Sequence, residues 1–246
     1  MQNKSIFDIS LVDLLEAGSH FGHQVRRWNP KMKPFIWQEK DNVHVFDLAI
    51  TAKNFKKAAE KLNQIAGEGG KIVFVGTKRQ AKDIVLEEAK RCEMPYVVSR
   101  WPGGLFTNWD QIKKSIDSLL KLKEDKEQGR LKKYTKKENV VIEKKIIRLE
   151  RLFGGLEELK GMPQAIFVID TQREKTAVKE AITRGVPVFA IIDSNSDPDL
   201  VDYPIPANDD AVRSIKIITE KIATAVLDGV NKYKKKAKET KNEPSN

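Results

Sequence analysis

The sequence predicts an α/β fold built on a doubly wound, mainly parallel sheet with helices on both faces. Three short apolar runs, at residues 72–75, 165–169 and 186–192, show no alternation with polar residues, which is typical of strands buried on both faces. The first two runs are each followed by an apolar stripe with helical spacing. Strands that alternate with helices form parallel sheets with right-handed crossovers, and ligands of such sheets usually bind at the carboxyl ends of the strands.

Both of these helices are preceded by a threonine that stands three residues before a glutamine or glutamate. Thr77 precedes Gln80, and Thr171 precedes Glu174. In a capping box the hydroxyl accepts the amide N–H of the third residue, whose side chain reaches back to the first amide. The spacing therefore predicts that each pair closes the end of its own helix.

The composition favours a polyanionic partner. The 246 residues include 45 basic and 35 acidic side chains, for a formal charge of +10, so nucleic acid is the first expectation and an acidic membrane surface the second. The single cysteine, Cys92, excludes a disulfide within the chain and favours a reducing compartment. We expect a cytoplasmic protein, because no apolar run approaches membrane-spanning length and residues 1–10 do not resemble a signal peptide.

Residues 20–37 combine basic and aromatic side chains with two prolines. Pro30 and Pro34 argue against a helix, and a basic loop that carries aromatic faces suits phosphates and exposed bases. The alternative, in which the aromatic rings only fold the loop back onto the sheet, is equally compatible with the sequence. The candidate RNA-binding residues of this segment are Arg26, Arg27, Trp28, Lys31 and Lys33.

A second candidate loop, at residues 100–109, follows a short predicted strand at residues 96–99. Its Pro-Gly-Gly turn lets the backbone approach another surface closely, while Arg100, Trp101 and Trp109 could grip and stack on nucleic acid. A small-molecule site is the competing interpretation. It finds little support, because the chain has neither a G-x-G-x-x-G nor a Walker phosphate loop.

Residues 109–160 are predicted to be an antiparallel coiled-coil hairpin inserted between two parts of the α/β domain, at residues 1–108 and 161–231. Two apolar stripes with steps of three and four support it. The region from 110 to 160 holds 15 basic and 10 acidic residues, a net charge of +5, and its tip carries Lys132 and Lys133 as candidate phosphate contacts. The alternative is that these charged side chains only face solvent, as they usually do on a charged coiled coil. Residues 232–246 are expected to form a flexible basic tail.

No enzymatic motif is found. The three histidines do not pair in sequence with a nucleophile, and there is no H-E-x-x-H, G-x-S-x-G or cysteine pair. A structural divalent cation is one possible cofactor, since carboxylate oxygens and one imidazole could ligate it, although most such aspartates form turns and helix caps. The candidate ligands are His23, Asp193, Asp209 and Asp210.

The chain closely resembles the bacterial small-subunit ribosomal protein two family from the first helix to the last. The resemblance is carried by AGSHFGHQVRRWNPKMKPFIW at 17–37, KIVFVGTKRQA at 71–81, RWPGGLFTNW at 100–109, LFGGL at 152–156, AIFVID at 165–170 and PVFAIIDSNSDPD at 187–199. It implies a three-layer, flavodoxin-like domain with an inserted coiled-coil hairpin. It also implies a structural constituent of the ribosome in the bacterial cytoplasm, with no enzymatic activity.

The implied partners are small-subunit rRNA and neighbouring ribosomal proteins, among them ribosomal protein one, which captures messenger RNA. No membrane and no small-molecule substrate are implied. Phosphates would be neutralised by Arg26, Arg27, Lys31, Lys33, Lys78, Arg79 and Arg100, and Trp28, Trp101 and Trp109 would pack on sugars or bases. The alternative class is a nucleotide- or flavin-binding α/β enzyme, which would need a phosphate-cradling loop.

Overall fold

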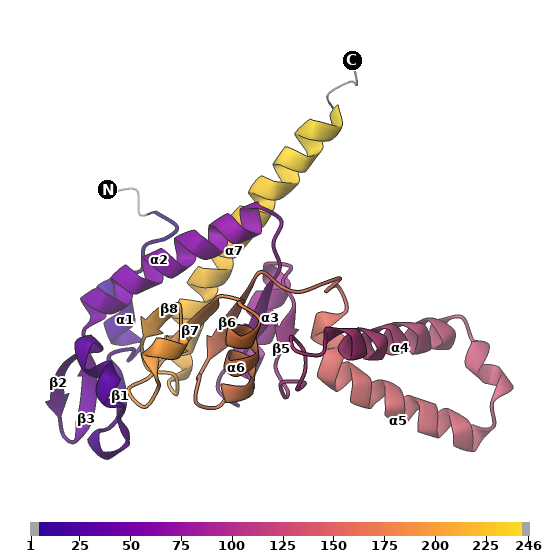
Figure 1. The fold of residues 1–246 in the computed structure, drawn as a ribbon, viewed down its shortest axis with the longest axis horizontal. Helices are drawn as coiled ribbons and strands as arrows, with labels where there is room; N and C mark the ends of the chain where they lie inside the picture. The colour runs from indigo at the N-terminus through magenta and orange to yellow at the C-terminus, as the bar shows by residue number, and fades with distance from the viewer. Residues whose placement is uncertain (1–4, 243–246) are drawn as a thin grey trace.

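A five-stranded parallel sheet lies at the centre of the fold (Figure 1). The computed structural model of the chain describes residues 5–242, apart from the side chains of residues 132, 133 and 240–242. The strands are β4 (Ile72–Val75), β5 (Tyr96–Val97), β6 (Ala165–Ile169), β7 (Val188–Ile192) and β8 (Tyr203–Pro206), in the order β5-β4-β6-β7-β8. Counted from β4 this order is 2-1-3-4-5, the order of flavodoxin-like doubly wound sheets. The prediction of an α/β fold with a mainly parallel sheet is confirmed.

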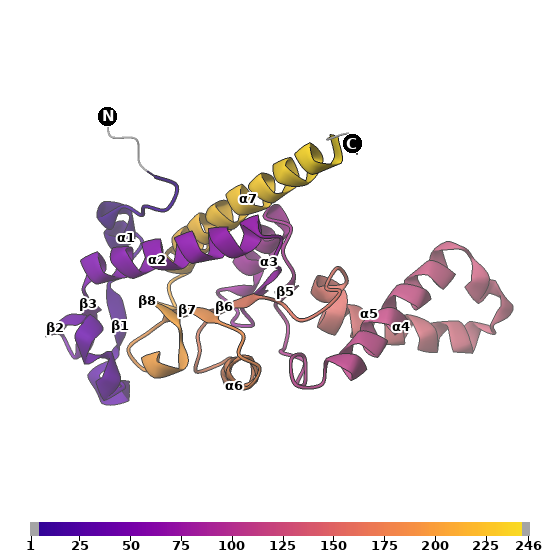
Figure 2. The ribbon, with the colours of Figure 1, turned by 45° about the horizontal axis from the view of Figure 1, so that its top comes forward.

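Successive residues of each central strand enter two different cores, which is why the strands are apolar without alternation. Ile72 and Phe74 pack with α2 (Leu48–Gly67), α3 (Lys82–Arg91) and α7 (Val212–Asn242). Val73 and Val75 pack with α6 (Lys175–Thr183) and the base of the next helix pair. Figure 2 shows α2 and α7 on one side of the sheet and α6 on the other. Each large apolar side chain buried in this way contributes about 1.5–3 kcal/mol.

A second, antiparallel sheet precedes α2 and consists of β1 (Phe21–Gln24), β2 (Ile36–Lys40) and β3 (Val43–Phe46), in the order β1-β3-β2. Asp41 and Asn42 join β2 to β3 with positive φ angles of 52° and 60°, as a tight hairpin turn requires. Between β1 and β2 the chain forms two 3-10 helices, η1 (Val25–Arg27) and η2 (Pro30–Phe35). The expectation that prolines exclude a helix here was wrong for short 3-10 helices, although residues 25–35 form no α-helix. Pro30 stands at the first position of η2, where no hydrogen bond is lost, and Pro34 lies inside η2.

Two long helices, α4 (Trp109–Glu127) and α5 (Lys136–Phe153), contact each other and extend away from the sheet (Figure 1). They are joined through η3 (Arg130–Lys133), and η4 (Gly154–Leu156) follows α5. Thr135 and Glu138 form a capping box at the start of α5, and these hydrogen bonds to Thr135 lower the pKa of Glu138. The apolar side chains buried between the pair and its base are Ile112, Ile116, Leu119, Ile146, Leu149 and Phe153.

A helix lies near each end of the described chain. A short helix, α1 (Leu11–Glu16), begins at Ser10, whose hydroxyl accepts the amide of Asp13. At the other end α7 continues through Asn242, so residues 232–242 of the expected flexible tail at 232–246 belong to a helix, whereas residues 243–246 lie outside the described part of the chain. Among the described residues, no helix is long and apolar enough to cross a membrane.

Candidate functional site

The carboxyl ends of β4, β6, β7 and β8 meet in a buried ionic cluster. Lys78, which follows β4, is only 8% exposed. Its Nζ lies 2.7 Å from Asp209 Oδ1, 3.1 Å from Asp170 Oδ2 and 2.6 Å from Asp210 Oδ1. Burial alone would lower the pKa of Lys78, but the carboxylates of Asp209, Asp210 and Asp170 raise it above its usual value. The Lys78 ammonium therefore keeps its charge inside the protein, where the neighbouring carboxylates balance it.

The small sheet brings His23 into the same cluster. The His23 amide donates to Asp193 Oδ1 at 3.0 Å and to Ser194 Oγ at 2.8 Å, which fixes β1 against the end of β7. In the ring, Nδ1 lies 3.0 Å from Asp193 Oδ1 and Nε2 lies 3.6 Å from Asp210 Oδ2. The hydrogen bond to Asp193 is the main cause that raises the pKa of His23, against the effect of burial. A Cβ on Gly22 would stand 3.0 Å from Ser194 Oγ, so glycine permits this close approach.

The cluster holds more negative than positive charge. Three carboxylates, from Asp170, Asp209 and Asp210, pair with the single ammonium of Lys78, and a fourth, from Asp193, lies close to Asp209 and pairs with His23. Asp209 is fully buried, and its Oδ2 has no hydrogen-bond partner. Burial, followed by the charges of Asp193 and Asp170, raises the pKa of Asp209 to about 7. Ligand atoms of His23, Asp193 and Asp209 lie within 4.8 Å of one another, so the structure brings together three of the four predicted cation ligands around one point.

The two predicted capping boxes are replaced by one contact between the loops that follow β4 and β6. Thr77 donates its amide to Glu174 Oε1 at 3.1 Å and its hydroxyl to the same oxygen. Neither α3 nor α6 has a side-chain cap, and α3 begins only at Lys82. Both capping predictions were therefore wrong: Thr77 and Glu174 pair with each other, 97 residues apart, and join the ends of β4 and β6. Burial raises the pKa of Glu174.

This geometry argues against the nucleotide- or flavin-binding alternative. In a doubly wound sheet the phosphate would bind at the crevice between β4 and β6, where the strand order reverses. Here that position holds the Lys78 ammonium, already paired with three aspartates, and the Thr77–Glu174 contact. An anionic cofactor would have to displace these contacts to bind there.

Exposed arginines lie along the rim of the same edge. Arg79 follows β4, Arg100 follows β5 and Arg173 follows β6, and all three are exposed. Because β5, β4 and β6 are adjacent and parallel, these residues follow one another across the carboxyl edge. The small sheet, which His23 fixes to the end of β7, carries two further exposed arginines, Arg26 and Arg27. We call these five residues the arginine rim; Arg173 was not among the sequence candidates.

The remaining candidates of the basic segment differ in availability. Lys33 is exposed, whereas Lys31 is exposed but paired with Asp197 at 3.0 Å and Asp199 at 2.7 Å. Trp28 is half-buried, and the centre of its ring lies 4.9 Å from the centre of the His44 ring. Trp37, which was not among the sequence candidates, is 67% exposed on β2. The side chains of Lys132 and Lys133, the candidates at the hairpin tip, lie outside the described part of the chain.

Two of the predicted RNA contacts, Lys78 and Trp101, are buried in the structure. Lys78 is enclosed by the ionic cluster, so it is not free to neutralise a phosphate. Trp101 is 6% exposed, packs edge-on against Phe106 and donates its indole N–H to Glu180 Oε1 at 3.2 Å. Its ring is part of the core and cannot stack on a base in this conformation.

Glu180 organises the loop that carries Trp101. Besides the indole, its carboxylate accepts the amides of Gly104 at 2.7 Å, Phe106 at 3.0 Å and Thr107 at 3.4 Å. The carboxylate is buried on α6 and receives donors from four different residues of the loop. The sequence offered one signal for this role, namely a glutamate between Ala177, Val178 and Ala181 on the apolar face of a predicted helix.

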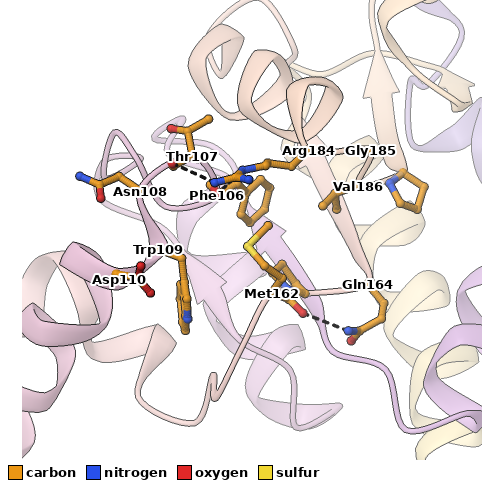
Figure 3. A pocket seen from close by; sticks show the side chains of 12 residues that line it. Phe106, Thr107, Asn108, Trp109, Asp110, Met162, Gln164, Arg184, Gly185 and Val186 are labelled. Carbon is orange, nitrogen blue, oxygen red and sulfur yellow. Dashed lines mark hydrogen bonds between the residues drawn. The ribbon is translucent and has the colours of Figure 1, made fainter.

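The outer side of this loop lines a pocket of about 540 Å³ near the base of α4 (Figure 3). Arg184 lies in it and donates to the carbonyl oxygens of Phe106 at 2.9 Å and Thr107 at 3.0 Å. Half-buried Trp109 and Met162 contribute apolar surface to its wall. The loop is thus held from both sides, by Glu180 through its amides and by Arg184 through its carbonyls.

Comparison with known proteins gives a consistent result. The family model described as ribosomal protein S2 matches residues 14–229. A protein from Sorangium cellulosum named small ribosomal subunit protein uS2 is 50% identical over 228 residues, which cover 93% of this chain and 82% of that protein.

Proteins of the same name from Nitratiruptor sp. and Rhizobium leguminosarum are each 48% identical. The aligned regions cover 90% and 91% of this chain, and 83% and 87% of the relatives. The match extends over the parallel sheet, the ionic cluster, the arginine rim and the helix pair. The chain therefore belongs to the ribosomal protein S2 family, whose members are structural components of the small ribosomal subunit.

Proposed function

We propose that the chain binds small-subunit rRNA through the arginine rim and thereby takes its place in the subunit during translation. The observation that carries this proposal is the row of exposed guanidinium groups across the carboxyl edge of the sheet. Arginine suits phosphate recognition because its planar fork can donate two parallel hydrogen bonds. The net charge of +10 adds a long-range attraction for RNA.

The loop at residues 100–109 would supply the shape of the interface. Exposed Arg100 and half-buried Trp109 lie at its two ends, and hydrogen bonds to Glu180 hold the backbone between them. A preformed loop loses little conformational entropy on binding. Recognition would then rest on charge and shape and not on the reading of base sequence.

The α4 and α5 pair would pack as a coiled coil, supported by its apolar stripes and by the Lys126–Glu143 ion pair at 2.8 Å between the helices. Protein partners, ribosomal protein one among them, would use exposed apolar side chains. Exposed apolar side chains on α1, β1 and β2 are Leu11, Val12, Leu15, Phe21 and Trp37. The site of action would be the ribosome of a bacterial cytoplasm.

Replacing Arg26 and Arg27 together by alanine tests the arginine rim. Each lost phosphate contact removes about 0.9 from the slope of log affinity against log salt for duplex nucleic acid. We therefore expect weaker binding to small subunits that lack this protein and a slope reduced by up to about 1.8. The matched control is Lys53→Ala with Lys57→Ala, which removes the same charge from the exposed face of α2. Equal affinities and slopes for the two double variants would contradict the proposal.

We also propose a structural divalent cation in the ionic cluster, because Asp209 Oδ2 is buried without a partner beside His23 and Asp193. One imidazole and two carboxylates suit Zn²⁺ or Mn²⁺. The cation would balance carboxylates that the Lys78 ammonium does not neutralise.

The cation site is tested by thermal unfolding with Zn²⁺ or Mn²⁺ alone. At a concentration one hundred times the dissociation constant, a bound ion should stabilise the fold by about 2.7 kcal/mol. The effect should be larger at pH 8 than at pH 6, because a proton on His23, whose pKa is raised, competes with the ion. Asp209→Asn should abolish it, whereas Asp117→Asn, at an exposed position on α4, should not. No stabilisation of the unmodified chain by either ion would refute the site.

A further inference from the structure

The last part of α7 is a basic helix that extends beyond the body of the protein (Figure 1). Residues 232–242 read KYKKKAKETKN and contain six lysines and one glutamate. All the side chains described in this part, through Glu239, are exposed. At 1.5 Å per residue the segment is about 16 Å long.

Three contacts fix the start of this segment to the body. The ring of Tyr233 lies against Gly69, where a Cβ would stand 2.7 Å from it. The Nζ of Lys234 lies 2.6 Å from the carboxylate of Glu93. The Nζ of Lys232 donates to Asn63 Oδ1 of α2 at 3.4 Å. The basic helix is therefore a fixed continuation of α7 with a defined direction.

The chemistry of the segment beyond these contacts favours a phosphate backbone over other anionic partners. Lys235 and Lys238 are exposed and lie one turn apart on the helix. Apart from Tyr233 at the anchor, Ala237 is the only apolar residue in 232–242. A helix that enters a membrane surface or a protein groove needs an apolar face, and this segment has none. Lysines on several faces suit a ligand recognised by charge alone.

We propose that the basic end of α7, residues 232–242, is a second contact to the rRNA phosphate backbone, separate from the arginine rim. This inference rests on the proposed function in that the ligand is small-subunit rRNA. The rim and the basic helix lie on different elements, the carboxyl edge of the sheet and the end of the last helix. Two separated contacts would raise the affinity and fix the orientation of the protein on the subunit.

The test compares the full-length chain with Lys235→Gln plus Lys238→Gln, and with Lys53→Gln plus Lys57→Gln as the matched control. Glutamine retains helix propensity, so both variants should keep the helical circular dichroism of the unmodified chain. Binding to small subunits that lack this protein is measured from low to high salt. We expect the α7 variant to bind more weakly, with a slope reduced by up to about 1.8, and the control to match the unmodified chain.

The outcomes separate this inference from the proposed function. If the unmodified chain binds the subunits and the α7 variant behaves as the control does, the inference fails while the proposed function stands. If the unmodified chain does not bind the subunits at all, both fail. Binding of the same variants to vesicles of phosphatidylcholine with 30% phosphatidylglycerol is measured in parallel. Loss of vesicle binding with unchanged subunit binding would assign the helix to a membrane surface and overturn the inference.

Discussion

Lys78→Met should lower the free energy of unfolding by about 3–5 kcal/mol, the range found when one partner is removed from a buried ion pair. Methionine fills a similar volume but supplies no charge, so Asp170, Asp209 and Asp210 would face one another without a cation. Urea unfolding monitored by circular dichroism measures the loss.

Lys82→Met, at an exposed position of the neighbouring helix α3, serves as the control and should change stability by less than about 0.5 kcal/mol. If Lys78→Met cost no more than this control, the ionic cluster would not be what joins the strand ends. A phosphate-binding role for Lys78 predicts a different result, namely weaker RNA binding with unchanged stability.

Glu180→Ala should cost about 3 kcal/mol or more, because each buried donor left without an acceptor costs about 1–3 kcal/mol. Four donors depend on this one carboxylate, from Trp101, Gly104, Phe106 and Thr107. The effect should be concentrated in the loop, so hydrogen exchange at the Phe106 and Thr107 amides should accelerate more than exchange in α2.

Glu180→Gln keeps the volume and one acceptor oxygen, so its cost should fall between that of alanine and the unmodified chain. Glu87→Ala, at an exposed position of α3, is the control for loss of a glutamate. Unchanged exchange at both amides in Glu180→Ala would show that the loop keeps its shape without the carboxylate. The proposed positioning of Arg100 and Trp109 would then lose its basis.

The sheet could be predicted because its signal is local. The strands β4 and β6 are short apolar runs, each followed by a helical stripe, and burial on both faces leaves that pattern whatever the rest of the chain does. The α4 and α5 pair was found in the same way, from the spacing of residues such as Ile112 and Ile146. In both cases the periodicity reports which face of an element is buried.

The candidate cation ligands His23, Asp193 and Asp209 were predicted together, but most other contacts of the site could not be, because they join distant parts of the chain. Thr77 has a suitable partner three residues away, yet it pairs with Glu174, which follows the neighbouring strand β6. Trp101 and Lys78 look like exposed RNA-binding residues until the positions of Glu180 and Asp209 are known. A sequence pattern shows what a side chain can do, whereas its partner decides whether it is available.

Sucrose-gradient sedimentation of a cell lysate, with this chain followed by mass spectrometry at moderate and high salt, tests whether the protein binds the small subunit through ionic contacts. An interface built on the arginine rim predicts that the chain migrates with small subunits and whole ribosomes at moderate salt. It should move toward the top of the gradient as salt rises, because counterions compete for the phosphates. A chain that stayed at the top at both salt concentrations would contradict the account.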